Sequence, residues 1–154
     1  MTMVTNPAVN DWVKEMAELT KPEQIVWIDG SREQLEQIKN EALATGEMIE
    51  LNQEKLPGCL YYRTNPKDVA RDEKRTVICT TRREDAGPTN NWVAPKEMYD
   101  RLSKLFDGSM KGRTMYAIPF SMGVPGTEFA KIGIELTDSI YVVLNMDIMT
   151  HVGQ

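Results

Sequence analysis

The sequence predicts an α/β protein in which helices flank a mixed sheet, and its 154 residues are expected to form a single domain. Two observations lead to this prediction. Stretches whose apolar residues follow the helical period alternate with short runs of β-branched and apolar residues. No internal repeat, low-complexity tract or linker interrupts this alternation. The length is sufficient for one domain with a substantial hydrophobic core.

Composition and charge narrow the class of protein. A content of 41% hydrophobic and 27% charged residues is typical of a soluble globular domain. The net charge of −5, without a dense Lys/Arg cluster, argues against a nucleic-acid partner. No apolar run approaches the ~20 residues of a membrane span, and the first residues lack the features of a signal peptide. We therefore expect a cytoplasmic protein in which Cys59 and Cys79 are reduced and buried in strands.

The first part of the chain predicts a helix, a buried strand and a second helix. Asn10 or Asp11 is expected to cap the first helix, and residues 25–28 form the strand. Ser31 and Gln34 match a capping box for the second helix, which Gly46 should end. The apolar positions that should face the core are Trp12, Val13, Met16 and Leu19 in the first helix, and Leu35, Ile38 and Leu43 in the second.

The middle of the chain predicts shorter elements. Strands are expected at 48–51, 59–63 and 75–80, with a single helical turn at 68–71. The 85–91 segment, rich in Gly, Pro and Asn, should be a loop. In this loop the amides of Asn90 and Asn91 should hold the backbone, with the indole of Trp92 packed underneath.

The last part of the chain predicts two helices around a pair of strands. Pro95 is expected to start a helix that ends before Gly108. Strands should follow at 114–120 and 131–136, and Thr137 or Asp138 should cap a final helix through Met149. The side of the Pro95 helix that should be buried consists of Met98, Leu102, Leu105 and Phe106.

Several sequence patterns resemble functional motifs but lack the residues, spacing or element order that those motifs need. Residues 108–114 look like a glycine-rich phosphate loop, but the predicted helix precedes them and the strand follows, the reverse of a P-loop. They are better interpreted as a helix C-terminus and a strand entry, with Arg113 in a structural role. His151 is the only histidine and the cysteines lack zinc-site spacing, so no metal site is expected. Ser121 is not in a nucleophile-elbow motif.

Three blocks of sequence have a recognisable order and spacing: DAGPTNNW at 85–92, MKGRTMYAIPFSMG at 110–123 and KIGIELTDS at 131–139. Together with DVAR at 68–71, they closely resemble the N-terminal domain of GTP-dependent phosphoenolpyruvate carboxykinase, and the resemblance covers nearly the whole chain. It implies a gluconeogenic lyase that converts oxaloacetate and GTP to phosphoenolpyruvate, GDP and CO2. The implied cofactors of the complete enzyme are GTP, Mn²⁺ and Mg²⁺. The family's chain is several times longer, so we expect 1–154 to lack the phosphate loop and metal ligands and to be inactive alone.

Arg71 is the main candidate binding residue. Its guanidinium offers a planar fork of donors that matches a carboxylate or phosphate, which lysine cannot reproduce. By sequence alone, a surface ion pair with Asp68 or Asp72 remains open. The resemblance implies instead that Arg71 contacts the carboxylate of oxaloacetate or phosphoenolpyruvate. It also implies that Glu73 matches an acid that interacts with a mobile active-site lid.

Two alternatives to an enzyme portion remain open: a stand-alone module that binds small dicarboxylates, and an assembly domain without a ligand. The expected partner is the remainder of the carboxykinase chain, and the face that meets it should favour self-association when exposed. The sequence departs from the family at Val124–Pro125, where Ser-Met-Gly-Pro is usual, and at Asp147 and His151, where basic residues are common. The end of the final helix is therefore expected to be frayed or differently packed.

Overall fold

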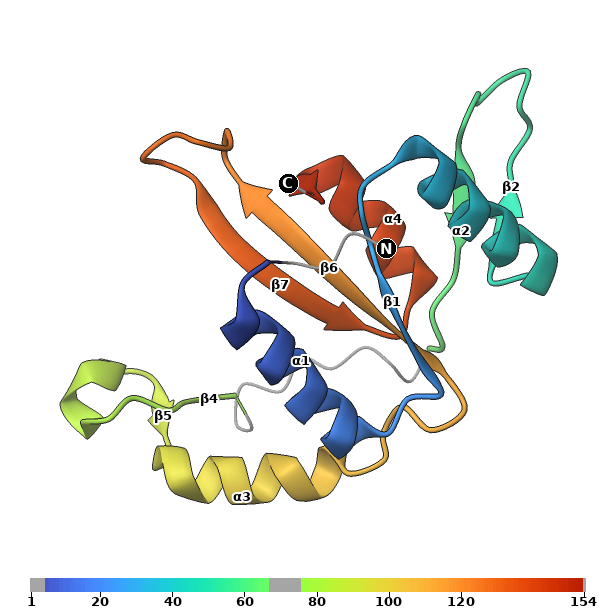
Figure 1. Ribbon diagram of the computed structural model, residues 1–154. Helices are drawn as coiled ribbons and strands as arrows, with labels where there is room; N and C mark the ends of the chain where they lie inside the picture. Colours follow the sequence, from blue (N-terminus) through green and yellow to red (C-terminus); the bar gives the residue numbers. More distant parts are fainter. Residues whose placement is uncertain (1–4, 67–75, 154) are drawn as a thin grey trace.

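The computed structural model describes residues 5–66 and 76–153 (Figure 1). It confirms an α/β domain with helices beside a mixed sheet. In chain order the described elements are α1 Pro7–Thr20, β1 Gln24–Trp27, α2 Arg32–Thr45, β2 Met48–Glu50, β3 Leu60–Tyr62, β4 Val77–Ile78, the 3-10 helix η1 Arg83–Ala86, β5 Asn91–Trp92, α3 Pro95–Phe106, β6 Thr114–Met122, β7 Lys131–Thr137, α4 Ile140–Met149 and β8 His151–Val152.

The main sheet is built around β6, the longest strand described. On one side β6 pairs with β1 in parallel, and on the other with β7 in antiparallel register. The short strand β8 pairs with Phe120 and Ser121 of β6, on the β1 side but beyond the end of β1. Two further two-stranded sheets, β2–β3 and β4–β5, lie outside it.

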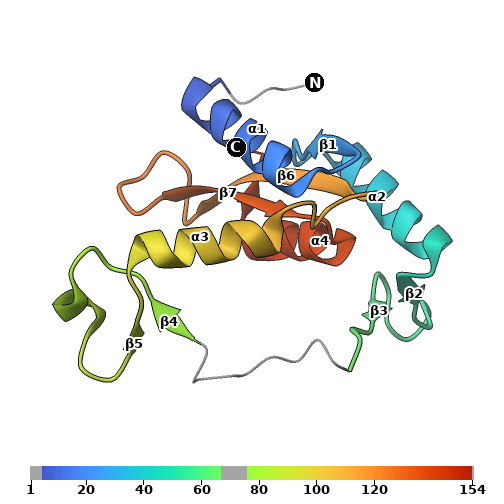
Figure 2. The same ribbon diagram turned by 90° about the horizontal axis from the view of Figure 1, so that it is seen from below.

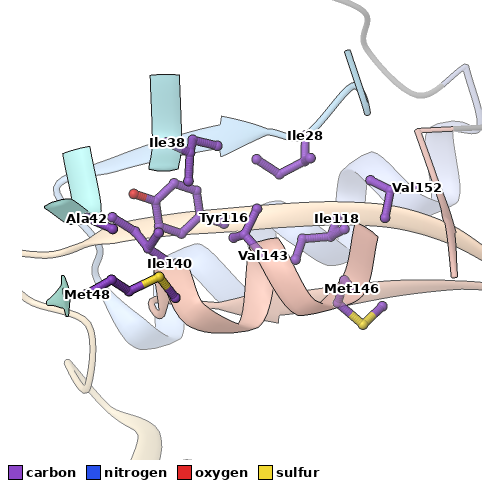
Figure 3. Packing of buried hydrophobic residues seen from close by; sticks show 10 residues of the cluster. All are labelled: Ile28, Ile38, Ala42, Met48, Tyr116, Ile118, Ile140, Val143, Met146 and Val152. Carbon is purple, nitrogen blue, oxygen red and sulfur yellow. The ribbon is translucent and has the colours of Figure 1, made fainter. Parts of the chain in front are cut away.

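Helices cover the two faces of this sheet unequally. Figure 2 shows α1 on one face and α4 on the other. The larger core lies between the sheet, α2 and α4 (Figure 3), and its members are Ile28, Ile38, Ala42, Met48, Tyr116, Ile118, Ile140, Val143, Met146 and Val152. The smaller core, under α1, has only Val13, Met115 and Ala117 as buried members. The β2–β3 hairpin joins the larger core, and the ring of Tyr62 stacks on that of Tyr141 with 4.3 Å between centroids.

The first helix begins earlier than the sequence predicts. Asn6, and not Asn10 or Asp11, is its N-cap, and its side chain accepts a hydrogen bond from the Ala8 N–H at 3.0 Å. Pro7 occupies the first turn, where its missing N–H and fixed φ favour helix initiation. Asn6, Asn10 and Asp11 all have side chains that can cap a helix, and Pro7 favours Asn6 because it directly follows it.

The predicted caps of α2 are largely confirmed. Ser31 Oγ accepts from the Gln34 N–H at 3.3 Å, and Gly46 ends the helix at φ 74°. The capping box is incomplete, however, because the Gln34 side chain bonds Asp29 N–H and Trp27 C=O. Asp29 accepts a hydrogen bond from the Ser31 N–H, and hydrogen bonding to Ser31 lowers the carboxyl pKa below its ordinary value.

Three other expectations are corrected. The cap of α4 is Ser139, whose Oγ accepts from the Val142 N–H, and not Thr137 or Asp138. The cysteines Cys59 and Cys79 are free, as expected, but both are exposed and lie outside strands. Fraying of the end of α4 is also contradicted, because Thr150 bonds the Met146 carbonyl through both its N–H and its hydroxyl, and the chain continues into β8. The alternative of different packing there stays a prediction.

The side of α3 predicted to be buried is largely exposed. Pro95 does begin this helix, as expected, but no residue of α3 is buried among the described residues. Leu102, Leu105 and Phe106 have exposed fractions of 41%, 68% and 49%. The apolar periodicity therefore identified a real helix, but the described part of the chain covers its apolar side only in part.

Candidate functional site

The β4–η1–β5 unit, residues 77–92, lies immediately after the segment that contains the main candidate residue. Figures 1 and 2 both show it set apart from the main sheet, at the far end of α3. Its strands are parallel, pairing Val77 with Asn91 and Ile78 with Trp92. The predicted 75–80 strand is thus confirmed only at its centre, and the predicted 85–91 loop overlaps a 3-10 turn at its start and a strand residue at its end.

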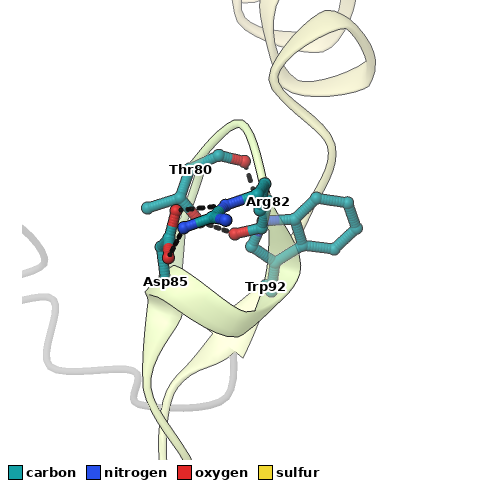
Figure 4. Close-up of polar contacts among 4 residues, drawn as sticks. All are labelled: Thr80, Arg82, Asp85 and Trp92. Atoms are coloured by element: carbon teal, nitrogen blue, oxygen red, sulfur yellow. Dashed lines mark hydrogen bonds and ion pairs between the residues drawn. The ribbon is translucent and has the colours of Figure 1, made fainter.

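Side chains within this unit hold its backbone in place (Figure 4). The Arg82 guanidinium bonds both carboxylate oxygens of Asp85, at 3.1 and 2.9 Å. The Thr80 hydroxyl donates to the Arg82 carbonyl at 2.7 Å. The Trp92 indole N–H donates to the Thr80 carbonyl at 3.0 Å, and so ties the end of β5 to the segment that follows β4.

The two asparagines act as the sequence predicts. The Asn90 amide donates to the Ala86 carbonyl at 2.7 Å, and the Asn91 amide donates to the Thr76 carbonyl at 3.2 Å. A polar pocket of about 330 Å³ lies beside them, lined by Arg83, Ala86, Gly87, Pro88, Asn90, Asn91 and Trp92. This lining supplies hydrogen-bond donors but no carboxyl or imidazole group, so it can contact an anion but offers no general acid or base.

The two predicted site residues, Arg71 and Glu73, lie outside the residues that the structure describes. Described residues close to them in sequence are those of β3 on one side and of β4 on the other. The roles of Arg71 and Glu73 therefore remain predictions from the sequence.

The 108–114 segment is a helix end and strand entry, as the sequence predicts. The Gly108 N–H donates to the Leu19 carbonyl at 2.8 Å, which joins the end of α3 to α1. Arg113 has the predicted structural role: it forms an ion pair with Asp138 and donates to the Ser109 carbonyl. Nearby, an ion pair with Lys21 lowers the pKa of the exposed Asp107.

The remaining sequence motifs lie within the described residues 5–66 and 76–153. In these ranges no three His, Cys, Asp or Glu side chains are placed to hold a metal ion. The buried Ser121 hydroxyl donates to the Gly123 carbonyl at 3.3 Å, and the exposed His151 belongs to β8. None of the described helices is long and apolar enough to cross a membrane.

The fold and this geometry define the class of protein as a single α/β domain with a polar, internally hydrogen-bonded loop unit at its edge. Residues 11–154 match the model of the phosphoenolpyruvate carboxykinase N-terminal domain family. The chain belongs to this family.

Similar proteins carry the name phosphoenolpyruvate carboxykinase (GTP). The chain is 53% identical over 150 residues to the one from Anaeromyxobacter dehalogenans strain 2CP-C, 50% over 149 residues to that from Renibacterium salmoninarum, and 47% over 149 residues to that from Corynebacterium efficiens. Each alignment covers 97% of this chain but only 24–25% of the relative. The chain thus spans about a quarter of the length of these relatives, at their N-terminal portion.

Proposed function

We propose that this chain is the substrate-side domain of a cytoplasmic GTP-dependent phosphoenolpyruvate carboxykinase. The complete enzyme would convert oxaloacetate and GTP to phosphoenolpyruvate, GDP and CO2. The observation that carries the proposal is the family match over residues 11–154, together with about 50% identity to relatives that bear this name.

In this proposal Arg71 binds the carboxylate of oxaloacetate or phosphoenolpyruvate. The support comes from the DVAR motif at 68–71 and from the chemistry of guanidinium, whose donor fork fits a carboxylate with two parallel hydrogen bonds. Glu73, two residues further on, contacts the active-site lid. The contribution of this domain is therefore to position the substrate.

The chemistry also needs phosphoryl-transfer machinery, which we assign to the rest of the complete enzyme. GTP and its divalent metal ions would neutralise charge on the transferred phosphoryl group there. The described residues of this chain do not fit a metal site, since no group of three ligands is assembled among them. No metal-dependent step is therefore assigned to the described residues.

The Arg71 assignment is tested in the complete enzyme with Arg71→Lys and Arg71→Ala. A charge-assisted bidentate contact contributes roughly 1.5–3 kcal/mol, so each variant should lose about ten- to a hundredfold in kcat/KM for oxaloacetate or phosphoenolpyruvate. The lysine variant should lose nearly as much as alanine, because the fork and not the charge binds. GTP affinity should not change.

Arg101→Lys is the matched control, because Arg101 is an exposed arginine on α3. It should leave the kinetics of both substrates unchanged. If Arg71→Lys also leaves the kinetics unchanged, the alternative is favoured, in which Arg71 forms a surface ion pair with Asp68 or Asp72.

The isolated chain 1–154 should show no carboxykinase activity and no stoichiometric, metal-dependent GTP binding. Titration calorimetry with GTP and Mn²⁺ measures this directly, and specific binding would contradict the proposal. A parallel titration with oxalate addresses the stand-alone alternative. Tight oxalate binding without the rest of the enzyme would favour a dicarboxylate-binding module.

A further inference from the structure

The outer edge of β7 is open in the described structure. β7 pairs with β6 along its whole length, from Lys131 to Thr137, and with no other described strand (Figure 1). Alternate N–H and C=O groups of an edge strand point away from the sheet and can pair with another strand. Seven residues is long for an edge left open, and Ile132 on it is 80% exposed.

An apolar groove lies on the face of β7 that points toward α1. Side chains alternate along a strand, so Ile132, Ile134 and Leu136 share one face. Ile134 and Leu136 pack against the smaller core, under α1. The groove has a volume of about 610 Å³, and its apolar lining includes Trp12, Met16, Leu19, Phe106, Ile134 and Leu136.

The described helices do not fill this groove. Trp12 on α1 and Phe106 on α3 both line it, yet they are 41% and 49% exposed. Leu105, the residue before Phe106 on α3, is 68% exposed. An open strand edge next to an uncovered apolar face satisfies both requirements of strand addition: backbone groups for pairing and a pocket for alternate side chains.

We infer that a strand from the chain that follows residue 154 in the complete carboxykinase pairs with the outer edge of β7 and buries its side chains in this groove. The inference rests on the proposed function, because it needs the longer chain. The relatives contain about four times the length of this domain, since the aligned part is 24–25% of each, so the chain to supply the strand exists in them.

The described chain ends in β8, with β6 and β7 between it and the open edge. Val152 of β8 pairs with Phe120, at the same end of β6 where β7 begins with the Met122–Lys131 pair. A new strand beside β7 would lie three strand spacings from β8, a distance of roughly 14 Å. About five extended residues span that distance. His151 pairs with Ser121 and Val152 with Phe120, so β8 runs away from that end, and the connection has to turn back before it crosses to the open edge.

Hydrogen–deuterium exchange on the complete carboxykinase and on chain 1–154 tests the inference. Amides of β7 that point outward should exchange at least about tenfold more slowly in the complete protein, because a new ladder protects them. Equal exchange in the two proteins would overturn the inference. Protection that is already present in chain 1–154 and rises with its concentration would assign the edge to a second copy, which also overturns it.

The variant Ile132→Lys tests the groove face separately. Ile132 is 80% exposed, so chain 1–154 should tolerate the lysine, whereas the complete protein should unfold at a lower temperature because a charge enters the new interface. Ile148→Lys on α4 is the matched control, at 79% exposure on another element, and should be tolerated in both. Equal effects of the two variants in the complete protein would overturn the assignment to β7.

This test is independent of the catalytic proposal. Absence of extra β7 protection in the complete protein, or tolerance of Ile132→Lys there, would refute the strand while leaving the kinetics of Arg71→Lys untouched. Unchanged kinetics of Arg71→Lys would refute the substrate contact while leaving the exchange rates of β7 untouched.

Discussion

The main sheet and the β4–η1–β5 unit are held together by different interactions. The largest fully buried side chains, Val13, Ile28, Met115, Ile118 and Val143, all belong to the main sheet and the helices beside it. In residues 77–92 only Ala86 is buried, and the unit depends on hydrogen bonds such as those of Trp92 and Arg82. Hydrophobic burial couples the main sheet into one cooperative unit, whereas the hydrogen-bonded unit can open locally.

Under the proposal that Arg71 binds the substrate carboxylate, this difference matters because the unit follows Arg71 in the sequence. A segment of low local stability can adjust around a substrate without disturbing the core. Variants in the two regions should therefore separate global from local stability.

The largest effect is expected for Ile118→Ala, in the centre of β6. Ile118 is fully buried in the larger core, and removing its side chain should cost about 2–5 kcal/mol of unfolding free energy. Ile78→Ala in β4 is the control, since Ile78 is 38% exposed, and should cost less than about 1 kcal/mol. Urea denaturation of chain 1–154 measures both. Similar losses would show that the two regions do not differ as described.

A smaller effect is expected for Trp92→Phe in the hydrogen-bonded unit. The change removes the indole N–H that donates to the Thr80 carbonyl, at a cost of about 1 kcal/mol. Amide exchange within 77–92 should accelerate about fivefold, with little change in exchange across β6. Arg82→Gln, which removes an exposed ion pair with Asp85, should do less. Acceleration throughout β6 would mean that the unit is part of the global cooperative core.

The smallest effect at neutral pH is expected for Tyr116→Phe in the larger core. Burial, followed by the charges of Glu41 and Glu47, raises the pKa of the Tyr116 hydroxyl above its ordinary value of 10.0. Above pH 10.0 the unfolded chain loses this proton before the folded chain does, so stability falls as the pH rises. Below that pH the contribution is fully present. The phenylalanine variant should therefore show a shallower alkaline loss of stability in thermal melts between pH 9 and 11.

Local signals in the sequence predicted local structure well. Ser31 and Gly46 predicted the two ends of α2, Pro95 predicted the start of α3, and the expected order of a helix before and a strand after residues 108–114 is confirmed. Where several residues could serve the same role, local signals were not enough. Asn6 competed with Asn10 and Asp11 as a cap, and only the geometry of Pro7 distinguished them.

Expectations that depend on distant partners were less successful. The apolar spacing of α3 predicts an amphipathic helix, but whether its apolar side meets a partner depends on elements far along the chain. Cys59 and Cys79 are expected in buried strands, yet both are exposed and lie just outside β3 and β4. The candidate site came from family resemblance, since a lone arginine has no local signal that separates a ligand contact from a surface ion pair.

The pairing of β1 with β6 also has a consequence for synthesis on the ribosome. Gln24 and Thr114 lie side by side in this ladder although 90 residues separate them. At roughly 5–20 residues per second, β1 waits on the order of 5–20 s before its neighbour is made. During that time α1, β1 and α2 have no sheet to cover, so the apolar residues of β1 are exposed on the nascent chain. The domain therefore completes its sheet late, and chaperones that bind apolar segments should engage residues 24–28 during translation.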